Sequence, residues 1–361
     1  MKTRLSVWAP LPPHVYFRRP RRTLPFPLEE AGCRLVAWAR HGIWHGVREL
    51  GLVEGDAVLV PAYNHGSEIE ALLRAGMRCL FYELDEDLRP RPTSLEALRD
   101  ERTRALYLTH FLGFPQDASR WRAWCDERGL LLIEDAAQAW LATDGGRPVG
   151  SFGDLAVFCL YKTFGLPEGA AVHQRGPAGP GVRSDPRPGV SELLRRNGRW
   201  LSSRSGAVAT AREWIRHAPP PEPPGEDYAL RDPHTGPWAL TPFVLRRITD
   251  AGAATQRRRN FEVLLDALGA LVPRPFTDVP SGASPFAFPI EVDDKRSVMS
   301  SLVAERIIPI DLWAASHPAM PQGRFAEVER RRARTLGLPV HQHLRPGDLR
   351  RIARVTSAAA R

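Results

Sequence analysis

The sequence predicts an α/β protein with a large domain, in which helices cover both faces of a mostly parallel sheet, and a smaller α/β domain. Three observations predict this class. Short apolar runs alternate with amphipathic runs between residues 35 and 134 at the spacing of βαβ units. The chain of 361 residues is long enough for two lobes. Its composition, 43% hydrophobic and 25% charged, is that of a globular protein.

The elements of the large domain follow from their periodicity. We expect an extended, proline-rich arm over residues 1–30, and then a helix over 35–50 whose apolar residues recur near every 3.6 positions. Four short apolar runs beyond it are typical of buried parallel strands, with amphipathic runs between them. The strands are predicted at 57–61, 78–84, 103–110 and 130–134, and the helices at 68–75, 94–99 and 118–128.

The second half of the chain is less regular. A Gly/Pro-rich run over 176–189 predicts a loop, a basic run over 191–217 predicts a helix, and the prolines of 218–225 predict a stiff linker. The remaining elements are a long helix over 243–268, a strand over 286–290, a helix over 297–304, a turn over 306–309 and a helix over 346–356. We therefore assign 31–240 to the large domain, with 176–235 as an atypical insertion, and 241–361 to the small domain.

The net charge of +9 raises the question of a nucleic-acid partner. The basic residues, 47 arginines and only three lysines, are spread along the chain and do not gather beside aromatic residues. We therefore expect no nucleic acid as partner, and interpret the charge as an attraction to small anionic substrates such as phosphates.

The cysteine pattern argues against metal and disulfides. The four cysteines are scattered and form no CxxC pair, so we expect no metal site and a reducing, cytoplasmic location. No apolar run approaches about 18 residues, so no membrane span is predicted. Prolines interrupt the N-terminal segment, which lacks the apolar core of a signal peptide.

Two predicted strand ends carry the residues of a candidate active site. Lys162 follows the apolar run 155–160, and Asp135 follows the run 130–134. An amine at one strand end and a carboxylate at another are what an enzyme using pyridoxal 5'-phosphate (PLP) needs, because the amine binds the cofactor aldehyde and the acid keeps the ring nitrogen protonated. Two plain alternatives stay open: Asp135 as the N-cap of a helix, and Lys162 as a solvated surface lysine.

The motifs around these residues resemble those of the DegT/StrS sugar aminotransferases, a family of fold-type-I PLP-dependent transferases. The resemblance spans nearly the whole chain and is most specific from residue 57 to 170. The segments that carry it are Gly55-Asp56-Ala57-Val58, Pro61-Ala62-Tyr63-Asn64-His65, Thr109-His110-Phe111-Leu112-Gly113, Glu134-Asp135-Ala136-Ala137-Gln138, Gly150-Ser151-Phe152-Gly153-Asp154, Lys162 with Glu168-Gly169, and Leu336-Gly337-Leu338-Pro339.

The resemblance implies a role for each matching position. Lys162 would form the Schiff base, Asp135 would bind the pyridine nitrogen, and Gln138 would lie near the ring hydroxyl. His65 falls where an aromatic ring stacks on the cofactor. Three further positions, Ala39, Arg40 and Cys159, fall where the family holds the cofactor phosphate, at a helix N-terminus and at a serine that is cysteine here.

Other residues have plainer interpretations. We expect Arg257, Arg258 and Arg259 to form a solvated helix face. Trp140 is either core packing or a pocket wall. For Trp313 and His317 we slightly favour packing over substrate contact.

The function that the resemblance implies is a PLP-dependent aminotransferase. The donor would be an amino acid, glutamate in most of the family, and the acceptor a carbonyl compound such as a keto-sugar or a natural-product intermediate. Family members are homodimers. The atypical region 176–235 keeps two alternatives open: a PLP enzyme of another reaction type (elimination, decarboxylation or condensation) and a non-catalytic descendant.

Overall fold

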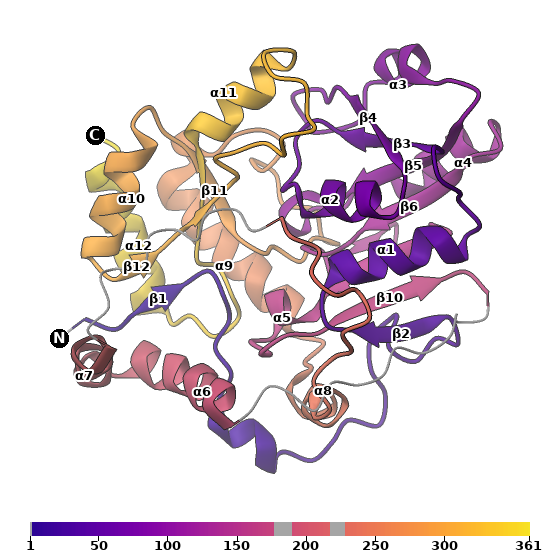
Figure 1. Cartoon of the computed structure of the whole chain (residues 1–361). Coiled ribbons are helices and arrows are strands. Elements are labelled where there is room, and N and C mark those ends of the chain that lie inside the picture. Colours follow the sequence, from indigo (N-terminus) through magenta and orange to yellow (C-terminus); the bar gives the residue numbers. More distant parts are fainter. Residues whose placement is uncertain (1, 177–189, 217–227) are drawn as a thin grey trace.

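The structure is a computed structural model that describes residues 2–176, 190–216 and 228–361. The predicted loop from residue 177 onward and the predicted linker at 218–225 lie outside the described residues. Figure 1 shows a large sheet on one side of the molecule and a smaller sheet with its helices on the other. No helix in the described ranges has the length and apolar character needed to cross a membrane.

Seven strands form the large sheet. Their order across it is β2 (Cys33–Val36), β10 (Ala170–Gln174), β9 (Leu155–Cys159), β6 (Leu131–Asp135), β5 (Thr103–Thr109), β3 (Ala57–Pro61) and β4 (Arg78–Tyr82). The five strands from β9 to β4 are parallel, and β10 and β2 add an antiparallel edge. This confirms the predicted mostly parallel sheet.

Helices cover both faces of the large sheet. The first face packs under α1 (Ala39–Glu49) and α2 (Ser67–Arg74), and the second under α3 (Pro92–Leu98) and α4 (Ala118–Asp126). Alternate strand residues go to opposite faces, so that Ile133 packs with the α1 side and Leu132 with the α4 side. Asp135, two residues after Ile133, is therefore on the α1 side.

The smaller sheet has three antiparallel strands, in the order β11 (Phe288–Glu291), β14 (Thr335–Leu338) and β13 (Ile310–Asp311). Its helices are α9 (Ala253–Leu268), α10 (Lys295–Ala304), α11 (Ala326–Arg334) and α12 (Pro346–Ala359). The N-terminal arm joins this part of the molecule, because β1 (Leu5–Ser6) pairs in parallel with β12 (Ile307–Ile308). The domain bounds drawn from the sequence stay a prediction.

The remaining elements belong to neither the large sheet with its covering helices nor the small one. They are η1 (Pro13–Phe17), η2 (Phe111–Gly113), β7 (Thr143–Asp144), β8 (Arg147–Pro148), α5 (Leu160–Thr163), α6 (Val190–Arg204), α7 (Gly206–Arg216), α8 (Thr241–Ile248) and η3 (Gly269–Leu271). Of these, α5 matters most, since it carries Lys162 directly after β9.

Two helices that the sequence predicts as continuous are each divided into two in the structure. The helix predicted over 191–217 divides at Ser205, whose hydroxyl accepts from the backbone N–H of Val208 at 3.4 Å, as an N-cap does. The helix predicted over 243–268 divides into α8 and α9, because the Asp250 carboxylate accepts from the N–H of Gly252 at 3.0 Å and closes a turn.

Three further predictions need correction. The helix expected from residue 35 begins at Ala39, because residues 33–36 form the edge strand β2. The turn expected at 306–309 contains β12. The arm is extended only in part, since residues 13–17 form a 3-10 helix.

Candidate active site

The candidate site lies at the carboxyl ends of neighbouring parallel strands, where open α/β sheets bind ligands. Asp135 is the last residue of β6, and Cys159 is the last residue of β9. Lys162 follows within α5, one turn after Cys159. Because β6 and β9 are paired and parallel, the sheet brings these three residues to one edge.

Hydrogen bonds fix the Asp135 carboxylate. Its Oδ2 accepts from the Tyr107 hydroxyl at 2.9 Å, and its Oδ1 accepts from the backbone N–H of Ala137 at 2.9 Å. Burial and the Glu68 carboxylate raise the pKa of Asp135, against the bond from Ala137, the Lys162 charge and the bond from Tyr107. The residues after Asp135 form turns, so the helix N-cap alternative is wrong.

Lys162 is half-buried among aromatic rings. Its Nζ lies 5.7 Å from the centroid of the Phe286 ring. Trp8 of the N-terminal arm stacks on Tyr161 at 5.9 Å and contacts Phe286 at 5.4 Å. The Lys162 charge also acts on Asp135 and Cys159. Lys162 is thus partly shielded from solvent by these rings.

The phosphate end of the predicted site is the N-terminus of α1. Ala39 is the first residue of this helix, and the N-cap residue Trp38 makes no side-chain capping bond. The Cys159 thiol lies beside it: burial raises the pKa of Cys159, and the Ala39 N–H is among the groups that oppose this. The thiol thus stays protonated, as a weak donor.

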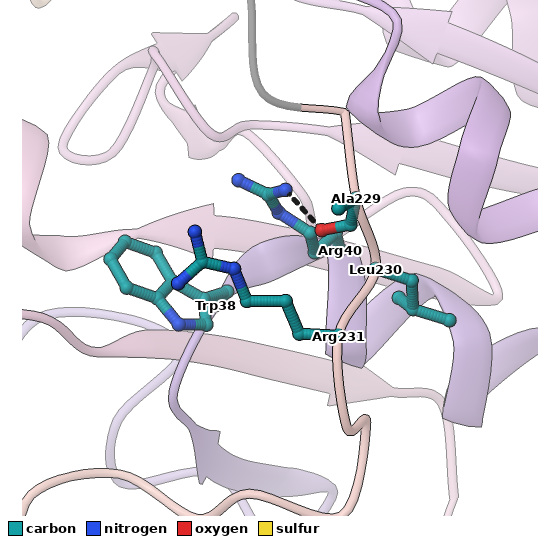
Figure 2. A pocket seen from close by; sticks show the side chains of 5 residues that line it. All are labelled: Trp38, Arg40, Ala229, Leu230 and Arg231. Atoms are coloured by element: carbon teal, nitrogen blue, oxygen red, sulfur yellow. Dashed lines mark hydrogen bonds between the residues drawn. The ribbon is translucent and has the colours of Figure 1, made fainter.

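A small cavity of about 80 Å³ opens at this end of α1. It is lined by Trp38, Arg40, Ala229, Leu230 and Arg231. Arg40 donates to the Ala229 carbonyl at 2.6 Å, and Figure 2 shows the Arg231 side chain extending toward Trp38. Two guanidinium groups and a helix N-terminus give this cavity a positive potential that suits an anion.

Hydrogen bonds and ring contacts hold the side chains of His65 and Gln138. The Nδ1 of His65 lies 3.1 Å from the Ser67 hydroxyl, and its ring meets the edges of Tyr228 and Trp313 at 6.0 and 6.2 Å. Gln138 Oε1 accepts from the N–H of Leu112 at 2.8 Å. The stacking role of His65 and the ring contact of Gln138 stay predictions.

The three arginines of α9 do not form one solvated face, and that expectation is wrong for the first of them. Arg257 is 1% exposed and donates to backbone carbonyls of the Lys162 segment. Arg258 is half-buried and donates to the Ala283 carbonyl at 2.7 Å, and only Arg259 is exposed. Periodicity misplaced Arg257 because a charged residue does not mark a buried helix face.

The aromatic residues left open by the sequence are packing residues. Trp140 is 1% exposed and donates its indole N–H to the Phe26 carbonyl at 2.9 Å. Trp313 is 5% exposed and packs on Tyr63 with ring centroids 4.8 Å apart. His317 Nε2 lies 3.2 Å from the Glu70 carboxylate. The preference for packing at these positions is consistent with their contacts.

Sequence reasoning missed three residues at the sheet edge. Tyr107 lies on β5 and bonds Asp135, and Glu68 on α2 accepts from the His65 N–H at 2.9 Å and acts on Asp135. Thr109 ends β5 and is in register with Asp135. The available signal was the alternation of side chains between the two faces of a sheet, because it places Tyr107 of β5 on the same face as Ile133 of β6.

The residues present fit PLP. The buried hydroxyl of Thr109 lacks a hydrogen-bond partner within the described part of the chain, beside the carboxylate that would meet the ring nitrogen. A buried hydroxyl without a protein partner at this place suits a site that a ligand completes. The half-buried Lys162 amine and the positive cavity at α1 supply the other two groups that the cofactor requires.

The sheet order, the two-part architecture and the lysine–aspartate edge define an α/β protein of the fold-type-I class, whose members use PLP. Residues 36–178 match the model of the DegT/DnrJ/EryC1/StrS aminotransferase family. The resemblance found in the sequence motifs is thereby confirmed.

Comparisons with individual proteins agree with this assignment. The chain is 32% identical over 126 residues to GDP-perosamine synthase of Vibrio cholerae, which covers 34% of each protein. It is 28% identical to dTDP-3-amino-3,4,6-trideoxy-alpha-D-glucose transaminase of Streptomyces venezuelae, over 87% of this chain and 79% of the relative. With several curated relatives the match spans only about a third of their length.

The fold is also that of solved structures. The structure of S. venezuelae DesV in complex with a ketimine intermediate matches with a TM-score of 0.65 and 22% identity. The match covers 91% of this chain and 85% of that one. At this identity the likeness concerns the fold alone, and the fold-type-I prediction is confirmed.

Proposed function

We propose that this protein is a PLP-dependent aminotransferase that moves an amino group from an amino acid, glutamate in the first instance, to the carbonyl of a keto-sugar or natural-product intermediate. The observation that carries this proposal is the pair Lys162 and Asp135 at the ends of β9 and β6, close enough for the lysine charge to act on the carboxylate. The family match over residues 36–178 supports it.

The chain's residues divide the work. When bound, PLP would supply an aldehyde and a ring that accepts electrons. Asp135, held by Tyr107 and Ala137, would keep the ring nitrogen protonated. The Lys162 Nζ would bind the aldehyde carbon, and after its release would move the proton of the substrate carbon.

The remaining predicted site residues would orient the cofactor. Gln138, whose carbonyl end is held by Leu112, would donate from its amide nitrogen to the ring hydroxyl. His65 would contact the ring face. At the other end the α1 N-terminus at Ala39, with Arg40 and the Cys159 thiol, would hold the phosphate.

The acceptor is proposed by analogy with the relatives. Their names contain nucleotide-linked sugars, GDP-perosamine and a dTDP-3-amino sugar. A net charge of +9 favours an anionic substrate of this kind. A panel of nucleotide-linked and free keto-sugars, assayed for amino transfer, would identify the acceptor.

We further propose that the protein is a homodimer in the cytoplasm. The homodimer rests on the family resemblance, and on the exposed side chains of Phe243 in α8 and of Leu240 at its N-cap. The cytoplasmic location rests on four cysteines that are all free thiols. Light scattering of the purified protein would give the oligomeric state.

Lysine chemistry gives a direct test. With only Lys2, Lys162 and Lys295 in the chain, borohydride reduction after incubation with PLP can label three side chains, which mass spectrometry separates. We expect the label at Lys162, its loss in Lys162→Ala, and no change in Lys2→Ala. In a separate, unreduced sample of wild type with PLP, glutamate should change the visible absorption and leave free pyridoxamine phosphate after denaturation.

Four outcomes would reject the proposal. Label at another lysine, or full turnover by Lys162→Ala, would remove Lys162 from the chemistry. A label at Lys162 without any amino transfer from glutamate or other amino acids would favour another PLP reaction, and no label would favour a non-catalytic descendant.

A further inference from the structure

Arg257 is a buried cation that the proposed chemistry does not use. It extends from α9, and its side chain is among the largest fully buried ones of the described chain, at 1% exposure. The acceptors described for it are all neutral carbonyl oxygens. They are Thr163 O at 2.8 Å, Lys162 O at 3.4 Å, Pro285 O at 2.9 Å and Gln342 Oε1 at 2.8 Å.

Stability alone does not explain this arrangement. Burying a guanidinium without a carboxylate partner costs free energy, and an apolar side chain of similar length fills such a space without that cost. Burial lowers the pKa of Arg257 to about 9, so the group still carries its charge at neutral pH. The role of Arg257 must therefore be sought in the segments that its hydrogen bonds hold in place.

Two of these bonds act on the segment that carries the candidate lysine. The carbonyls of Lys162 and Thr163 end the short helix α5, where helix carbonyls have no partner further along the helix. Arg257 donates to both, and Gln342 Nε2 donates to Thr163 O at 3.0 Å. A cation at this end of a helix also interacts favourably with its carbonyls.

The third bond acts on the surface against which the lysine packs. Pro285 O accepts from Arg257 Nη1, and the next residue is Phe286, whose ring lies 5.7 Å from Lys162 Nζ. One planar guanidinium thus joins the backbone of Lys162 to the segment of Pro285 and Phe286, against which the Lys162 amine packs. Its fixed fork of donors can span two segments, which a single ammonium cannot do.

We propose that Arg257, supported by Gln342, is a positioning residue that fixes the Lys162 backbone and so aims the Lys162 amine at the aldehyde of the bound cofactor. This inference rests on the proposed function, and goes beyond it by assigning the alignment of the amine to a residue of the small-domain helix α9. Arg257 itself touches neither cofactor nor substrate in this account.

Two ligands separate positioning from binding. Pyridoxamine 5'-phosphate has no aldehyde and binds without using the Lys162 amine, whereas PLP must react with it. We expect Arg257→Met, which keeps an unbranched stem and removes the donors, to bind pyridoxamine 5'-phosphate within about threefold of wild type. Its rate of covalent PLP capture at Lys162 should fall by about tenfold or more, because misplacement of about 1 Å is that costly.

Matched variants make the test specific. Arg259→Met, on the exposed face of the same helix, should behave as wild type with both ligands. Arg257→Lys should stay slow with PLP, because a point charge cannot span Thr163 and Pro285. The unfolding temperature of each variant records the structural cost separately.

The outcomes are distinct. Equal losses for both ligands in Arg257→Met would make Arg257 a merely structural residue and overturn the inference, as would wild-type capture by Arg257→Met or Arg257→Lys. If wild type itself captures no PLP at Lys162, the proposed function fails and the inference falls with it, which the wild-type control alone reveals.

Discussion

The hydroxyl of Tyr107 is the side-chain donor that the structure places on Asp135, at 2.9 Å. Burial first, and then the Asp135 charge, raise the pKa of Tyr107, so the phenol stays protonated and donates. Tyr107→Phe removes a bond to a charged group, which contributes about 1.5–3 kcal/mol. We expect PLP binding to weaken by about tenfold or more, measured by spectroscopic titration.

The same substitution has a pH signature. Without the Tyr107 bond, which favours the charged form, the pKa of Asp135 rises, so the carboxylate is lost at a higher pH as the solution is acidified. As the pH is lowered, the PLP affinity of Tyr107→Phe should therefore begin to fall at a higher pH than the affinity of wild type. Tyr82→Phe is the control, because its buried hydroxyl donates to the Tyr107 carbonyl at 2.9 Å on the far face of the sheet. A common pH profile for all three proteins would contradict the role of Tyr107.

Cys159 stands at the phosphate end with a weak donor. Its thiol is 4% exposed, and burial raises its pKa, so it offers only a poor hydrogen bond to an anion. Cys159→Ser places a hydroxyl there, and a gain of about 1 kcal/mol corresponds to roughly fivefold tighter PLP binding. Pyridoxal, which lacks the phosphate, should show no change. Equal gains for pyridoxal and PLP would show that the substitution does not act through the phosphate.

Within the large sheet, strand β6 holds its neighbouring turn through Glu134. This buried carboxylate lies 3.1 Å from His110 Nε2 and accepts from the N–H groups of Gly150 and Phe152 at 3.0 and 2.8 Å. Burial raises the pKa of Glu134, but the bonds from His110 and the backbone outweigh it, and the pKa lies below the ordinary 4.5. The turn that precedes β9 is thereby fixed to β6.

The sign of the pH effect follows from that direction. A lowered folded-state pKa stabilises the fold above pH 4.5, and the contribution is lost as the pH falls through the folded-state value. Glu134→Gln should cost about 2–4 kcal/mol at pH 7, because a buried donor loses its acceptor. Thermal unfolding from pH 7 to 3.5 should show the gap to wild type closing below pH 4.5, with Glu127→Gln, 71% exposed at its side chain, as control. A gap that does not change with pH would show that Glu134 is not ionised in the fold.

At this scale the sequence predicts some elements well and others poorly. The buried strands β3, β5 and β6 each contain an apolar run, because both of their faces are covered, and such runs are unambiguous between turn residues. The edge strand β2 is short and lies just before α1, so one helical pattern in the sequence covers both. The division of α8 from α9 depends on one side-chain bond of Asp250, which periodicity does not register.

The residues of the candidate site also differ in how well the sequence predicts them. Lys162 and Asp135 could be predicted because each ends an apolar strand in a distinctive motif. Arg257 could not, because its role depends on contacts with Lys162 and Thr163, which lie 95 and 94 positions away in the sequence. Long-range contacts of a charged side chain leave no periodic signal in its own helix.

Across the whole molecule, the N-terminal arm connects the two sheets. Its strand β1 pairs with β12 beside the small sheet, while Leu11 and Val15 pack in the cluster against β9 and α8. Between them the arm backbone passes over the segment after Lys162, so closely that a Cβ added at Gly165 would lie 2.5 Å from the Ala9 carbonyl oxygen. The arm is therefore part of the core and closes one side of the candidate site.

A matched pair of arm substitutions tests this placement. Leu11 is fully buried, and Phe17 is 90% exposed six residues later on the same arm. Leu11→Ala leaves a cavity beneath the sheet and should cost about 2–5 kcal/mol, whereas Phe17→Ala should change stability by less than about 0.5 kcal/mol. Denaturant unfolding of both variants measures the difference. If both substitutions proved equally harmless, the arm would merely lie on the surface. The Lys162 segment would then lack the cover that the structure gives it.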